Sequence, residues 1–71
     1  MKTIIKYDTS IYPLSIIKTA IDDYSDLCKI ELTLIDSKAV LCFYDCIYDC
    51  TITIKEFSNY LIDLIGAKNV N

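Results

Sequence analysis

The spacing of the apolar residues changes from a helical period to strict alternation within the first half of the chain. Between residues 14 and 24 apolar side chains recur every three or four positions, which indicates a helix with one buried face. Between residues 28 and 35 they alternate with polar ones, as in a strand with one buried side. The apolar positions are Leu14, Ile17, Ala20, Ile21 and Tyr24 in the first stretch, and Cys28, Ile30, Leu32 and Leu34 in the second.

Two shorter signals precede and open the helix. Residues 3–7 alternate as a first strand, with Ile5 and Tyr7 on one face. Pro13 is expected to open the helix, because its fixed φ suits a first helical position and its missing N–H has no helical partner there. The chain thus begins as a strand followed by a helix.

The second half of the chain predicts another strand and another helix. Asp36-Ser37 reads as a tight turn, and the run 39–44 is apolar on both faces, as expected of a central strand. Thr53 and Glu56 have the spacing of a capping box, which predicts that the last helix begins at Thr53. Gly66 suits a left-handed residue at its end. The expected buried residues of this helix are Phe57, Leu61, Leu64 and Ile65.

The order β-α-β-β-α predicts one α+β domain over residues 1–71. A right-handed crossover places the first two strands parallel with a gap between them, and the third strand fills the gap, which gives the sheet order 1-3-2 with both helices on one face. Charges interrupt every apolar run within about ten residues, fewer than the ~20 that cross a bilayer. We therefore expect a cytoplasmic protein with no membrane partner.

Composition removes several classes of function. The 71 residues carry a net charge of −3, seven lysines, no arginine and no histidine. Scattered lysines without arginine do not favour nucleic acid as a partner. The lack of histidine removes the usual general base at neutral pH. The expectation is a non-catalytic protein without a cofactor.

Three cysteines recur at every fourth position, and a fourth lies upstream: Cys42, Cys46, Cys50 and Cys28. A four-thiolate zinc or iron–sulfur site is one reading of this set. On an extended strand, however, residues four apart lie about 13 Å from each other, too far to share an ion. Disulfides are another reading, but they are not expected in a reducing compartment. Free thiols that are buried or half-buried are the favoured interpretation.

A three-stranded sheet covered on one side leaves two edges and one face open, and an added strand can pair with an edge. The open face is expected to show Phe43 or its neighbours. Tyrosine is enriched at binding surfaces. The candidate binding residues are Tyr7, Phe43, Tyr44 and Tyr48.

Two segments, residues 8–20 and 56–63, together resemble the HxsD family, the small accessory protein of bacterial His-Xaa-Ser systems. Ile11-Tyr12-Pro13 is similar to the family's entry to the first helix, and Asn59 to Asp63 is similar to an Asn-x-Leu-Leu-Asp-like stretch in the last. The chain departs from the family at its end, where residues 64–69 contain no arginine, and in its cysteine cluster. The resemblance is therefore to a divergent member.

This resemblance implies a setting beside radical S-adenosylmethionine (SAM) enzymes that modify a ribosomally made peptide. The family member is then a non-catalytic partner that delivers the precursor peptide or scaffolds the maturase. Two alternatives stand beside it. One is a small metal or redox protein that uses the four cysteines, and the other is a structural protein that forms a homodimer through its open sheet face.

Overall fold

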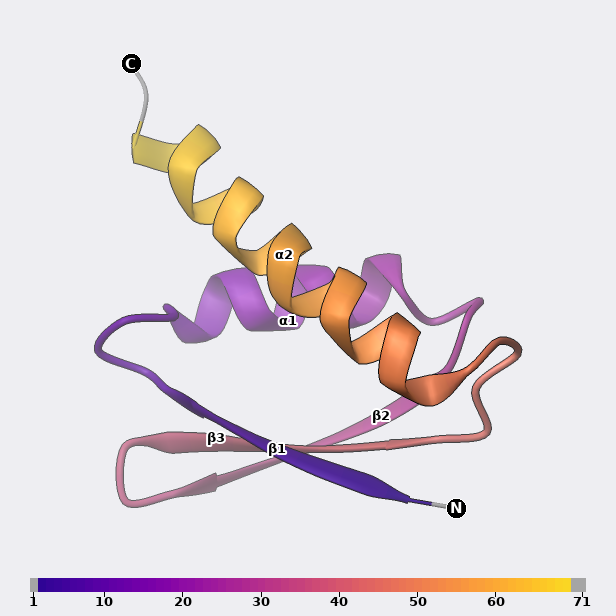
Figure 1. Ribbon diagram of the computed structural model, residues 1–71. Helices are drawn as coiled ribbons and strands as arrows, with labels where there is room; N and C mark the ends of the chain where they lie inside the picture. Colours follow the sequence, from indigo (N-terminus) through magenta and orange to yellow (C-terminus); the bar gives the residue numbers. More distant parts are fainter. Residues whose placement is uncertain (1, 70–71) are drawn as a thin grey trace.

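The computed structural model describes residues 2–69 and has the predicted α+β architecture (Figure 1). The three strands form one sheet in the order β1-β3-β2, and β3 is antiparallel to both neighbours. Both helices lie on the same side of this sheet in Figure 1. The elements are β1 (Thr3–Asp8), α1 (Leu14–Asp23), β2 (Lys29–Ile35), β3 (Lys38–Tyr44) and α2 (Cys50–Asn69).

The core lies between the sheet and the helices, and it takes alternate residues from each strand. On β3 the odd-numbered residues are buried, as expected of a central strand. On α1 the buried stripe includes Ile16, which the helical spacing did not single out. The buried apolar residues are Tyr7, Ile16, Ile17, Ala20, Cys28, Ala39, Leu41, Phe43, Ile54, Phe57 and Leu61.

An aromatic cluster occupies the centre of this core. The Phe57 ring centroid lies 5.2 Å from that of Phe43 and 5.3 Å from that of Tyr24, both edge-to-face. The Tyr7 ring lies 6.2 Å away. Edge-to-face pairs bring the positive ring edge to the negative ring face, so Phe57 is held by specific contacts against β3 and the C-terminal end of α1.

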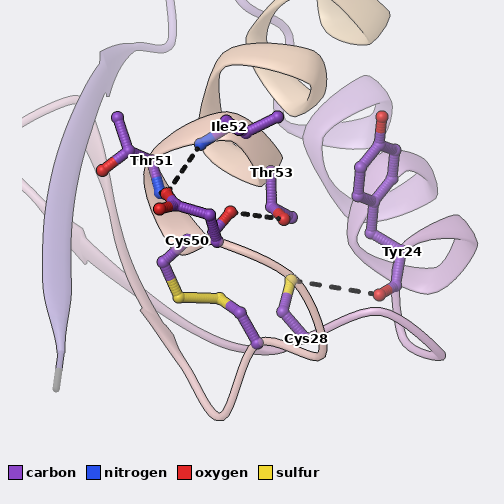
Figure 2. Close-up of a disulfide and its surroundings, with 8 residues drawn as sticks. Tyr24, Cys28, Cys50, Thr51, Ile52 and Thr53 are labelled. Atoms are coloured by element: carbon purple, nitrogen blue, oxygen red, sulfur yellow. Dashed lines mark hydrogen bonds between the residues drawn. A yellow bond between two sulfur atoms is a disulfide. The ribbon is translucent and has the colours of Figure 1, made fainter.

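The start of α2 corrects the predicted capping box. The helix begins at Cys50, one turn before Thr53, and the Asp49 carboxylate accepts hydrogen bonds from the N–H groups of Thr51 (2.8 Å) and Ile52 (3.3 Å) (Figure 2). The Thr53 hydroxyl donates to the Asp49 carbonyl oxygen at 3.0 Å, as a residue inside the helix does. Aspartate is at least as good an N-cap as threonine, so the earlier cap prevails.

The predicted end of α2 at Gly66 is also wrong. The helix continues to Asn69, and no glycine within residues 2–69 has a positive φ. Glycine permits a left-handed conformation without requiring one. By contrast, the turn at Asp36-Ser37 is confirmed: both residues have positive φ, 48° and 64°, the conformation that joins antiparallel strands through two residues.

Neither helix, over the described residues, combines the length and apolar character needed to cross a membrane.

Candidate functional site

No helix or strand within residues 2–69 covers the side of the sheet away from the helices (Figure 1). Apart from lysines, its members are Ile4, Asp8, Glu31, Thr33, Ile35, Val40, Cys42 and Tyr44. Four of the seven lysines also lie on it, at Lys2, Lys6, Lys29 and Lys38. We call this surface the open face. It is rich in lysine although the chain as a whole is acidic.

Tyr44 is held at one end of the open face by two neighbours. Its hydroxyl donates a hydrogen bond to the Glu31 carboxylate at 3.0 Å, and the Lys2 ammonium lies 5.3 Å from the centre of its ring. The bond to Glu31 raises the pKa of Tyr44 above its usual value, because only the neutral hydroxyl can donate it. The Glu31 carboxylate is therefore already hydrogen-bonded within the open face.

A shallow hollow of about 230 Å³ lies at the other end of the open face, near the β2–β3 turn. Ile35 and Val40 give it apolar walls, and Lys6, Lys38 and Asp36 complete its lining. Lys38 also forms an exposed ion pair with Asp8 at 3.6 Å. Apolar walls beside ammonium and carboxylate groups suit a side chain with an apolar body and a polar end.

The two-residue turn determines which backbone groups of β2 are unpaired. Ile35 and Lys38 flank the turn as a directly opposed pair, and in this kind of hairpin that pair is hydrogen-bonded. Bonded and non-bonded pairs alternate along the ladder. The N–H and C=O groups of Ile30, Leu32 and Leu34 therefore point away from β3. We call this row of outward groups the β2 edge.

The opposite edge of the sheet is less open. By the same alternation, β1 turns the groups of Ile4, Lys6 and Asp8 outward. The Asp8 carbonyl, however, already accepts hydrogen bonds from the N–H groups of Ile11 (3.0 Å) and Tyr12 (2.8 Å). The chain turns back there and shortens the row available to a partner.

The C-terminal half of β2 also lacks the features that normally block strand pairing. Natural edge strands carry charges, proline or bulges against unwanted partners. The last four residues of β2, Leu-Thr-Leu-Ile, contain neither a charge nor a proline. Leu34 is 55% exposed and Ile35 is 53% exposed, on opposite faces of the strand. The β2 edge is therefore the candidate binding site.

The four predicted binding residues do not form one surface, and two of them are not on the surface at all. Phe43 is fully buried and Tyr7 is 5% exposed, because both occupy strand positions that face the helices. Their assignment to an exposed aromatic surface is wrong. Tyr44 lies on the open face, whereas Tyr48 is 68% exposed in the loop before α2.

Burial of the Tyr7 hydroxyl should make the free energy of unfolding fall at alkaline pH. This hydroxyl shares a 2.7 Å hydrogen bond with Ser58, and burial raises its pKa above the usual 10.0 despite this bond. As pH rises, the Tyr7 hydroxyl therefore ionises in the unfolded chain before it does so in the folded one. Its contribution to the free energy of unfolding is complete below pH 10.0 and is lost as pH rises toward the folded pKa. Urea unfolding measured from pH 8 to pH 11 should give a weaker decline for Tyr7→Phe than for the wild type.

Tyr48→Phe is the matched control, because Tyr48 lies outside the core. It should keep the wild-type dependence on pH. An alkaline decline of equal steepness in Tyr7→Phe and the wild type would show that burial of the Tyr7 hydroxyl has no part in it.

The prediction that all four cysteines are free thiols is wrong, because Cys46 and Cys50 form a disulfide with Cα atoms 5.5 Å apart (Figure 2). The predicted separation assumed an extended chain, but the segment turns into α2 instead. Cys28 is buried beneath the helices, which raises the pKa of its thiol, and Cys42 is half-buried on the open face. The four sulfurs therefore do not form one site, and no group of three or more metal-ligating side chains occurs among the described residues.

The chemistry offered at the β2 edge is main-chain hydrogen bonding flanked by apolar contact. The unpaired groups lie at Ile30, Leu32 and Leu34, and the lysine-rich open face begins beside them. Such a row can extend its sheet by one strand. No family model, curated protein or solved structure matches this chain.

Proposed function

We propose that the protein is a non-catalytic binding module that captures an extended segment of a peptide or protein along the β2 edge. One observation carries the proposal: the unpaired groups of Ile30, Leu32 and Leu34 adjoin a stretch without charge or proline. A segment bound there donates to and accepts from these groups and becomes a fourth strand.

Selectivity comes from the side chains on either side of the added strand. Alternate side chains of the partner lie toward the helices, beside the half-exposed Leu34, or toward the open face, beside Thr33 and Ile35. Lys6 and Lys38 line the hollow that adjoins Ile35. Asp36 lines the same hollow, so the favoured partner has apolar residues on one side and a polar group on the other.

The resemblance to the HxsD family supports a particular setting for this activity. In that setting the protein is a bacterial cytoplasmic accessory factor, and its partner is a precursor peptide or the radical SAM maturase that modifies it. Titration with the neighbouring precursor peptide and with the maturase tests this assignment. If neither binds at tens of micromolar, the assignment of the partner is lost.

The site itself is tested without knowing the partner, by selection from a displayed library of random decapeptides. Leu34→Lys places a charge beside the edge, as natural edge strands do, and should weaken the selected peptides at least tenfold. Ile47→Lys is the matched control, because Ile47 is similarly exposed at 66% but lies in the loop before α2. Peptides that bind both variants equally would place capture elsewhere and overturn the proposal.

A further inference from the structure

We propose that the β2 edge pairs with the β2 edge of a second copy, antiparallel about a two-fold axis at Leu32. This inference rests on the same exposed edge as the proposed function, and it adds a way in which that edge is controlled. Two three-stranded sheets then become one continuous sheet, with β2 of each copy at its centre. A partner peptide must displace the second copy.

The unpaired backbone groups of β2 are self-complementary in this register. When Leu32 lies opposite Leu32 of the second copy, Ile30 lies opposite its Leu34, and Leu34 opposite its Ile30. These are the residues whose N–H and C=O groups point away from β3. Each opposed pair exchanges two hydrogen bonds, so every outward group within the strand finds a partner.

Neighbouring registers satisfy fewer groups or oppose like charges. An axis at Glu31 sets two Glu31 carboxylates directly against each other, which is unfavourable. An axis at Thr33 carries Ile30 past the end of the opposing strand, toward Asp36. An axis at Ile30 sets Leu32 against Cys28, whose N–H already donates to the Tyr24 carbonyl oxygen at 3.2 Å.

The side chains favour the same register. Leu34 shares a strand face with Ile30 and Leu32 on the helix side, yet it is 55% exposed. In the pair it lies beside Ile30 of the second copy, which extends the apolar layer across the junction. On the open face, Glu31 meets Thr33 and Lys29 meets Ile35, so no like charges are opposed.

The symmetry predicts a closed dimer. Opposed residues share a face, so the axis is perpendicular to the sheet, and the helices of both copies lie on one side while the two open faces join on the other. The outer strands of the joined sheet are then the two copies of β1, whose outward row is shortened at Asp8. A two-fold interface uses the same patch on both copies, so the assembly stops at two.

The test combines sedimentation equilibrium with amide hydrogen exchange across a range of protein concentrations. The wild type should form dimers as concentration rises, and the amides of Ile30, Leu32 and Leu34 should become protected in parallel. The Thr33 amide, already bonded within the sheet, should change little. Leu34→Lys should raise the dimer dissociation constant at least tenfold, whereas Ile4→Lys, an exposed residue of β1, should leave it unchanged.

Two outcomes overturn the inference: a monomer at the highest concentration, or a dimer in which these three amides stay unprotected. Peptide titration of dilute protein separates this failure from failure of the proposed function. A monomer that still binds selected peptides at the β2 edge would overturn the dimer and leave the proposed function standing. A dimer that selected peptides do not dissociate would overturn the proposed function and the control of the edge by the second copy, but not the dimer itself.

Discussion

Replacing Phe57 with alanine is expected to remove most of the free energy of unfolding at room temperature. The side chain is fully buried, and its ring packs near those of Phe43 on β3, Tyr7 on β1 and Tyr24, the residue that directly follows α1. Truncating a buried phenylalanine costs about 3–5 kcal/mol, because the transfer energy is lost and a cavity remains. A domain of this size has a free energy of unfolding of only about 5 kcal/mol. Circular dichroism with urea titration measures the loss directly.

Tyr48→Ala and Phe57→Leu are the controls for this experiment. Tyr48 is exposed, so its truncation should change the free energy of unfolding by less than about 0.5 kcal/mol. Phe57→Leu keeps most of the buried volume and should lie between the two alanine variants. If Phe57→Ala were as stable as Tyr48→Ala, the aromatic cluster would not be the centre of the core.

The strand order was predictable because the chain offered few alternatives. The change of period separates α1 from β2, and the two-residue turn at Asp36-Ser37 keeps β3 next to β2. Because β3 is apolar on both faces, it fits the gap between β2 and β1. The same turn also contained the information that identifies the β2 edge. Once Ile35 and Lys38 are opposed, alternation determines which backbone groups point outward.

The face of Phe43 was not predictable from its own segment. A run that is apolar on both sides has no period that distinguishes inside from outside, so only the register with its neighbours decides. Thr3 lies opposite Phe43 and shares the inward side of β1 with Ile5 and Tyr7. The alternation in residues 3–7 had already placed Ile5 and Tyr7 together, and this was the signal that Tyr7 is a core residue.

The disulfide escaped prediction because two helix starts competed over a few residues. One acceptable cap is the pair Thr53 and Glu56, and the other is Asp49 alone. Local sequence does not choose between them. When the helix begins at Cys50, the preceding residues turn back and Cys46 approaches it. The distance assumed for an extended strand then no longer applies.

Loss of the Cys46–Cys50 disulfide is expected to lower the free energy of unfolding by about 2 kcal/mol, the entropy of closing so short a loop in the unfolded chain. For a small domain this corresponds to a fall of roughly 10 °C in Tm. The fold should survive, because Asp49 still caps α2 and the core residues are unchanged. Urea unfolding of the wild type with and without a reducing agent measures the difference.

The double variant Cys46→Ser/Cys50→Ser should match the reduced wild type and show no response to the reducing agent, whereas Cys42→Ser, which leaves the disulfide intact, should keep the full response. A wild type that ignores the reducing agent and reacts with thiol reagents at all four cysteines would show that the bond does not form.

Peptide capture should persist after reduction of the disulfide. The outward direction of the backbone groups of Ile30, Leu32 and Leu34 is set by the β2–β3 ladder and not by the disulfide. The proposed function is therefore compatible with a reducing cytoplasm, where such a bond is normally opened.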